Sequence, residues 1–72
     1  MVRISLLELP NSIRKTKIYR DCNRYGAVND INKNEYDYSF ERFARCTLDY
    51  DNGEWTCVFT EDDYIWFVLT WL

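Results

Sequence analysis

The residues of this chain that could react or bind a ligand are carboxylates and thiols. It has 12 acidic side chains, three cysteines and no histidine. Histidine is the commonest side chain for proton transfer near neutral pH and the commonest ligand of transition metals. With only two glycines, a glycine-rich phosphate loop is also excluded. We therefore expect no enzyme activity, no cofactor and no metal.

The three cysteines, Cys22, Cys46 and Cys57, are an odd number and include no Cys-x-x-Cys pair, so they do not form a disulfide framework. We expect small buried thiols in a reducing compartment. The chain has no apolar N-terminal run preceded by positive charge, and the apolar run from Ile65 to Leu69 is too short to cross a bilayer. We therefore expect a cytoplasmic protein, in the host cytoplasm if a phage encodes it.

One segment resembles an EF-hand calcium loop in its oxygen ligands. Between Asp30 and Glu41, acids or amides stand at positions 1, 3 and 5 and a glutamate at position 12. Glu35 replaces the glycine that makes the sharp turn of such loops, and Asp37 replaces an apolar residue. The favoured interpretation is a polar connecting loop over Asn29 to Asp37, without calcium.

Six acids lie between residues 49 and 63 with no basic residue among them. They are Asp49, Asp51, Glu54, Glu61, Asp62 and Asp63. Residues 1–29 contain six basic and two acidic side chains, whereas residues 30–72 contain three basic and ten acidic ones. The net charge is only −3, but the basic residues are concentrated in the first part of the chain and the acidic residues in the second. The acids either solvate two turns or form a surface for a basic partner.

The acids surround a predicted β-hairpin over residues 44–60. Asn52-Gly53 is a favoured dipeptide for a two-residue turn, and it joins two alternating runs. The expected opposed pairs are Asp51 and Glu54, Tyr50 and Trp55, Leu48 and Cys57, and Cys46 and Phe59. One face of the hairpin is then apolar and the other suits solvent.

The segment from Tyr64 to Leu72 is predicted as a further strand after a polar turn at Asp62-Asp63. In this register Trp66 faces Phe59, and a second apolar face needs cover. That face consists of Ile65, Phe67, Leu69 and Trp71. Either the N-terminal elements cover it, or it is an interface with a partner or a second copy.

The remaining elements are less regular. The alternation from Val2 to Leu6 predicts a strand. Residues Ser12 to Tyr25 are predicted as a helix that ends at Gly26, with a strand over Lys17 to Asn23 as the alternative. The segment Tyr38 to Ala44 is ambiguous, because Tyr36, Phe40, Phe43 and Thr47 lie at helical spacing. From Phe40 we favour strand, since the segment leads directly into the hairpin.

The chain is thus expected to be one small α+β domain, 1–72. Its antiparallel sheet would have about four strands, with a C-terminal β-meander over Arg45 to Trp71 and one helix packed on a face. An all-β fold is the alternative, since strand-favouring residues outnumber helix formers.

The function that these features favour is partner binding without catalysis. In size, acidity and lack of catalytic groups, the chain is similar in character to small phage or mobile-element proteins that inhibit a host enzyme or defence complex, although no motif supports the likeness. We expect an inhibitor or modulator that docks an acidic, aromatic-backed surface on a basic groove of a larger protein, such as one that processes nucleic acid. The six acids would steer the encounter, and the anchors would be Tyr50, Trp55, Tyr64 and Trp71.

Two other functions remain open. One is a structural homo-oligomer or small subunit that assembles through the apolar C-terminal strand. The other is direct nucleic-acid binding through the basic residues between Arg14 and Arg24, which the acidic remainder of the domain disfavours.

Overall fold

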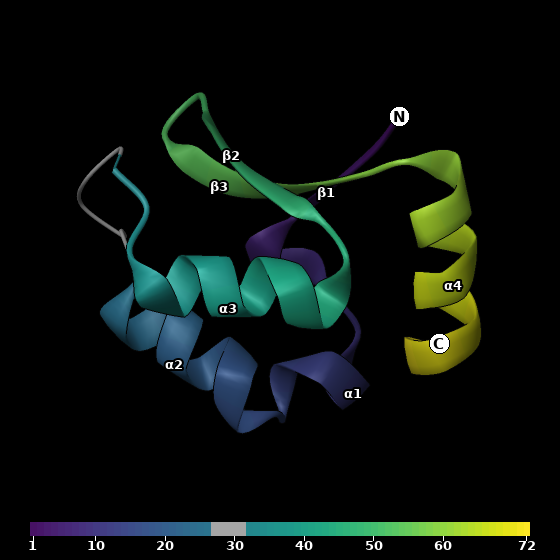
Figure 1. The fold of residues 1–72 in the computed structure, drawn as a ribbon, viewed down its shortest axis with the longest axis horizontal. Helices are drawn as coiled ribbons and strands as arrows, with labels where there is room; N and C mark the ends of the chain where they lie inside the picture. Colours follow the sequence, from purple (N-terminus) through teal and green to yellow (C-terminus); the bar gives the residue numbers. More distant parts are fainter. Residues whose placement is uncertain (27–31) are drawn as a thin grey trace.

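A computed structural model describes residues 1–26 and 32–72 of the chain, and it has an α+β fold. Strands β1 (Val2–Ser5), β2 (Thr47–Asp51) and β3 (Glu54–Phe59) form an antiparallel sheet in the order β1-β3-β2. The helical elements are η1 (Leu6–Glu8), α1 (Asn11–Arg14), α2 (Lys17–Tyr25), α3 (Glu35–Ala44) and α4 (Glu61–Trp71). In Figure 1, α3 lies under the sheet with α1 and α2 beyond it, and α4 stands at the end where β3 stops.

The predicted hairpin and the N-terminal strand are confirmed. Asn52 and Gly53 both have positive φ angles, 51° and 81°. A two-residue hairpin turn of type I′ requires positive φ at both positions. Tyr50 pairs with Trp55, and the ladder ends at Thr47 opposite Val58. The expected pairing of Cys46 with Phe59 is wrong, because β2 begins one residue after Cys46.

We expect the two glycines to resist substitution for different reasons. At Gly53 an added Cβ meets no atom within 4 Å, but φ is +81°, so Gly53→Ala should cost about 1–2 kcal/mol in backbone strain. At Gly26 an added Cβ would overlap the Asp37 carboxylate and the Cys22 carbonyl, so Gly26→Ala should cost about 1–3 kcal/mol through overpacking. Urea unfolding measures both losses.

Asparagine tolerates the left-handed conformation better than alanine does. Gly53→Asn should therefore recover stability relative to Gly53→Ala, whereas Gly26→Asn should not improve on Gly26→Ala. Recovery at both positions would contradict the close packing around Gly26.

The C-terminal segment is a helix, so the predicted fourth strand and the C-terminal β-meander are wrong. A further strand had been expected beside β3, but β1 occupies that place, with Val2 opposite Phe59. The helix α4 begins where the Thr60 hydroxyl accepts a hydrogen bond from the Asp63 N–H at 3.2 Å. The sequence Glu61-Asp62-Asp63 is therefore the first turn of a helix, where acids are favourable.

The strand expected from Phe40 is also a helix, α3. The Asn34 side chain caps the N-terminus of α3, and Asp37 completes a capping box. Arg45 ends this helix in the left-handed conformation, with φ 57° and ψ 48°, which separates it from β2. Within the predicted loop Asn29 to Asp37, residues 35–37 open α3, while residues 29–31 lie outside the described part.

The predicted helix Ser12 to Tyr25 is interrupted. It divides into α1 and α2 at Thr16, which has an extended backbone and caps α2 by accepting a hydrogen bond from the Tyr19 N–H at 3.2 Å. Within residues 1–26 and 32–72, the fold thus has three strands and four α-helices rather than about four strands and one helix. The all-β alternative is wrong.

The core lies between the helices and the inner face of the sheet. Its buried apolar residues are Leu6, Leu9, Ile13, Tyr19, Cys22, Phe40, Ala44, Leu48, Cys57, Phe59 and Phe67. One carboxylate joins α3 to the edge of the sheet: Glu41 accepts hydrogen bonds from Lys33 Nζ at 2.6 Å and from the Leu48 N–H at 2.7 Å. Among the helices of residues 1–26 and 32–72, none has the length and apolar character needed to span a membrane.

Candidate protein-binding surface

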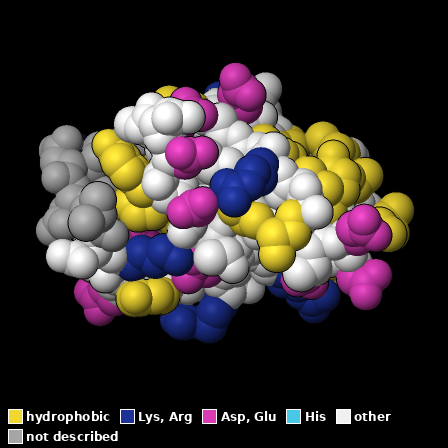
Figure 2. Space-filling model, turned by 90° about the horizontal axis from the view of Figure 1, so that it is seen from above, with side chains coloured by type: hydrophobic (Ala, Val, Ile, Leu, Met, Phe, Trp, Pro, Cys, Tyr) yellow, Lys and Arg dark blue, Asp and Glu magenta, His cyan; other side chains and the backbone are white. Residues whose placement is uncertain are grey.

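The outward side of α4 exposes a continuous line of large apolar side chains. Ile65, Leu69 and Leu72 are 58%, 81% and 74% exposed. They stand at i, i+4 and i+7, so they lie on one side of the helix. We call these three residues the α4 stripe. Figure 2 shows hydrophobic side chains gathered at the end of the molecule where α4 lies.

The opposite side of α4 packs on the rest of the fold and fixes the direction of the stripe. The Phe67 ring, which is fully buried, lies 4.7 Å from the Phe59 ring centroid. Tyr64 packs edge-on against the same Phe59 ring at 5.9 Å, and Trp71 lies 5.3 Å from Phe43. The candidate anchors Tyr64 and Trp71 therefore point towards the core and are only partly exposed.

A further contact joins α4 to the end of α3. The guanidinium carbon of Arg45 lies 4.2 Å from the centroid of the Trp66 ring, a cation–π distance. The left-handed backbone of Arg45 directs its side chain to this ring while the chain turns into β2. The contact fixes the side of α4 that contains Trp66 and does not cover the α4 stripe.

Three of the predicted acids are at the N-terminal end of the same helix. Glu61 and Asp62 are exposed, and Asp63 is partly exposed. Glu61 and Asp62 precede Ile65 by four and three residues, so they border the α4 stripe on the same side. The structure therefore combines an acidic end and an apolar stripe in one helical face.

The other three acids lie on the hairpin. Asp49 forms an ion pair with Arg3 across the outer face of the sheet, with 3.0 Å between Oδ2 and Nη1. Asp51 and Glu54 are exposed beside the turn. Because β3 separates Glu54 from Glu61, the six predicted acids form two groups at opposite ends of this strand and not one patch.

The hairpin aromatics form a pair of their own. The Tyr50 and Trp55 rings are T-shaped, with centroids 5.2 Å apart. Tyr50 is 42% exposed, while Trp55 is partly buried. Both stand on the core side of the sheet, next to the turn, and so belong to a different surface from the α4 stripe.

Three basic residues of the N-terminal half lie on α2, whereas Arg3 lies on the sheet. Lys17, Arg20 and Arg24 are exposed on α2, which Figure 1 places away from the sheet. Lys17 Nζ pairs with Asp21 Oδ2 at 2.6 Å. The charge polarity of the sequence is therefore only partly a polarity in space, because Arg3 of the basic half pairs with Asp49 of the acidic half on the sheet.

The thiols are structural. All three cysteines are free, and Cys22 and Cys57 are buried. Burial raises the pKa of the Cys22 thiol to about 12, and the nearby Asp37 carboxylate, 3.5 Å from the sulfur, adds to this rise. The Cys46 thiol raises the pKa of Cys57, together with burial. Neither buried thiol is a nucleophile near neutral pH, because the reactive form is the thiolate.

We expect the stability of the fold to decrease with pH above about 9, the ordinary pKa of the thiol in the unfolded chain. The folded Cys22 thiol stays neutral up to about pH 12, so its contribution is complete below pH 9 and is lost between these values. The predicted slope is up to about 1.4 kcal/mol per pH unit. Urea unfolding of wild type and Cys22→Ser from pH 7 to 10.5 measures it, and identical slopes would contradict the prediction.

Comparison of the chain with protein-family models, curated protein sequences and solved structures gave no significant match. In the part of the chain that the structure describes, no group of three or more acids or cysteines could hold a metal ion.

The sequence interpretation placed Ile65 and Leu69 on a candidate interface, but it missed Leu72 and the helix that exposes all three. In the predicted strand, Ile65 and Leu69 share a face with Phe67 and Trp71, whereas the helix separates the two pairs and adds Leu72 to the exposed side. The i, i+4, i+7 spacing and the Thr60 cap were the available signals.

Proposed function

We propose that the protein is a non-enzymatic binding module that places α4 in a groove of a larger protein and so inhibits or modulates it. The observation that supports this proposal is the exposed α4 stripe on a helix whose opposite side is already packed. After its acidic first turn, α4 has large apolar side chains on its exposed side as well as on its packed side. A helix of this kind is normally buried by other parts of a protein. Residues at i, i+4 and i+7 are the usual anchors of a helix that lies in an apolar groove.

A groove in a larger protein suits α4 better than a second copy of the chain does. The helix is about 16 Å long at 1.5 Å per residue. A stable interface buries about 800 Å² on each partner, which is more than three side chains on a convex helix provide to another convex helix. A groove encloses the helix from several sides and so buries more of it.

The acidic first turn of α4 indicates the charge of the partner groove. The first turn of α4 has three acids, and the described helix has no basic residue. We propose a partner groove with basic residues at the end that receives Glu61 and Asp62. These charges speed the encounter and fix the direction of the helix, while the apolar contacts provide most of the affinity.

Site-specific photo-crosslinking tests the proposal. A photoreactive residue replaces Leu69 in one protein and the exposed Arg20 of α2 in a matched control, and each is irradiated in an extract of the source cells. We expect one crosslinked protein from position 69 that is absent from position 20. Excess wild-type protein should suppress it, and excess Leu69→Asp should not.

Equal crosslinking at both positions, or equal suppression by Leu69→Asp, would contradict the proposal. Light scattering after gel filtration examines self-association separately. We expect a monomer at concentrations up to about 100 μM; a dimer that Leu69→Asp dissociates would instead support the homo-oligomer function.

A further inference from the structure

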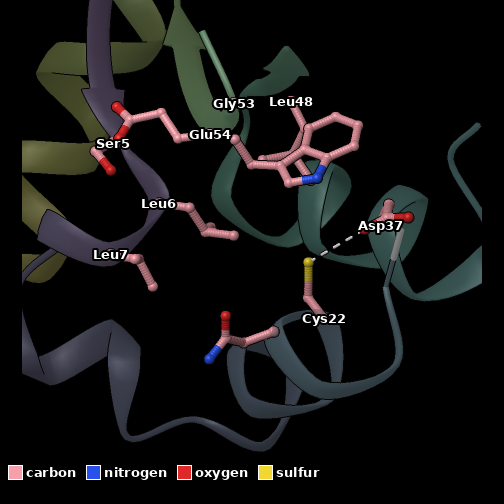
Figure 3. Close-up of a pocket in the computed structure, with 10 residues that line it drawn as sticks. Ser5, Leu6, Leu7, Cys22, Asp37, Leu48, Gly53 and Glu54 are labelled. Carbon is pink, nitrogen blue, oxygen red and sulfur yellow. Dashed lines mark hydrogen bonds between the residues drawn. The ribbon is translucent and has the colours of Figure 1, made fainter. Parts of the chain in front are cut away.

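A cavity of about 150 Å³ lies between the N-terminal segment, α2 and the hairpin. Its apolar lining comes from Leu6, Leu7, Leu48 and Trp55. In Figure 3, Leu6 and Leu7 stand on one side, Glu54 and Gly53 come from the hairpin, and Cys22 of α2 closes the far side. The cavity is at the turn end of β3, whereas α4 follows the other end, so it is separate from the α4 stripe.

The polar side chains that line the cavity include two carboxylates and two neutral groups that both donate and accept hydrogen bonds. They belong to Glu54, Asp37, Ser5 and Asn23, and no Lys or Arg is among the described lining residues. Glu54 is exposed at the hairpin, so its carboxylate is accessible to a ligand at the mouth. The cavity therefore favours a ligand with positive charge and N–H donors over an anion.

Asp37 contributes negative charge from a buried position in the lining. It is buried, and its carboxylate accepts hydrogen bonds from the Asn34 N–H at 2.9 Å and from the Cys22 thiol at 3.5 Å. These bonds hold the carboxylate in place. Glu54 is thus the residue for direct contact with a cation, and Asp37 adds to the negative potential.

We propose that this cavity is a binding site for a small organic cation, an alkylammonium or alkylguanidinium group with an apolar stem. The stem lies against Leu6, Leu7 and Leu48, and the charged head meets the Glu54 carboxylate. The Trp55 ring, on the core side of β3, adds apolar surface for the stem. Lysine and arginine side chains have this chemistry, with a methylene stem and a charged end.

The volume limits the size of the ligand. An apolar cavity of about 150 Å³ accommodates benzene, so a four-carbon stem fits inside this one with the charged head at its opening. We expect such a small ligand to bind with a Kd near the millimolar range. Methyl-resolved NMR measures affinities of this order.

The experiment titrates the isotope-labelled protein with n-butylguanidinium and, separately, with the neutral isostere n-butylurea. We expect saturable shifts of the Leu6, Leu7 and Leu48 methyl signals and of the Trp55 indole signal with the cation. With n-butylurea the affinity should be at least fivefold lower. The methyl signals of Leu69 and Leu72 should not move, since they belong to the other surface.

Two variants distinguish this site from general attraction to an acidic protein. Glu54→Gln should weaken cation binding at least threefold, whereas Asp51→Asn, which removes a neighbouring acid outside the cavity, should leave it within twofold. Asn23→Phe, at an exposed position of α2 beside the cavity, should block binding. Each variant is checked for an unchanged fold by its remaining NMR signals.

A lack of saturable shifts in these methyl groups would overturn the proposal. Equal affinity for n-butylurea, or equal weakening by Glu54→Gln and Asp51→Asn, would overturn the assignment of a cation. Neither outcome affects the proposed role of α4, because crosslinking from position 69 tests a surface that the cavity does not include.

Discussion

Replacing Phe59 with alanine should lower the free energy of unfolding by about 3–5 kcal/mol. Phe59 is fully buried, and its ring contacts Phe67 at 4.7 Å and Tyr64 at 5.9 Å between centroids. The truncation therefore leaves a cavity between the sheet and α4. Small domains have total stabilities near the lower end of about 5–15 kcal/mol, so the variant should be largely unfolded or should melt far below wild type.

Urea unfolding followed by circular dichroism measures this loss. Val58→Ala is the matched control, because Val58 precedes Phe59 on the same strand but faces the outer side of the sheet and is only partly buried. Its loss should be clearly smaller. Similar losses for the two variants would contradict the placement of Phe59 between the sheet and α4.

Replacing Leu69 with aspartate should weaken binding to the crosslinked partner by about thirtyfold or more, the effect of losing one hot-spot residue of about 2 kcal/mol. Leu69 is the most exposed member of the α4 stripe. The substitution puts a charge into the apolar part of the groove while disturbing few contacts within the fold. Isothermal titration calorimetry with the purified partner measures the change in Kd.

Thr70→Asp is the matched control for Leu69→Asp. It adds the same charge to the same end of α4, but Thr70 lies to the side of the α4 stripe, where its hydroxyl donates a hydrogen bond to the Trp66 carbonyl at 2.8 Å. Binding by Thr70→Asp should change by less than threefold. Equal weakening by the two variants would mean that added charge, and not the stripe, determines the effect.

The hairpin was predictable because its determinants are local. Asn52 and Gly53 tolerate the positive φ angles of the turn, and the alternation on each side then fixes the register. The hydrophobic side of the hairpin follows from the same alternation. For this reason the predicted pairs hold for all four residues nearest the turn, Tyr50, Asp51, Glu54 and Trp55.

The identity of α4 depended on information that is not local. Aromatic and β-branched residues fill the segment, and they favour strand. The expected fourth strand also needed a free edge on β3, and β1, about fifty residues earlier in the chain, occupies it. Thr60 followed by three acids is a local signal for a helix start, and giving it more weight than residue composition would have predicted α4.

The candidate residues divide in a similar way. The sequence identified the exposed acids Asp51, Glu54, Glu61 and Asp62, since charged side chains near turns and helix ends remain in solvent. It also placed the acids in two groups at opposite ends of one strand, as the structure has them. It did not predict the inward orientation or the partial burial of Tyr64 and Trp71. Those properties depend on the helical period of α4 and on its packing against Phe59 and Phe43.

The most direct measurement of the central claim is the footprint of the partner on the protein. Methyl-resolved NMR and amide hydrogen exchange are recorded with and without the purified crosslinked partner. We expect shifts of the Ile65, Leu69 and Leu72 methyl signals and slower amide exchange along α4, with α2 unchanged. A footprint on the hairpin or on α2 that leaves the α4 stripe unaffected would contradict it.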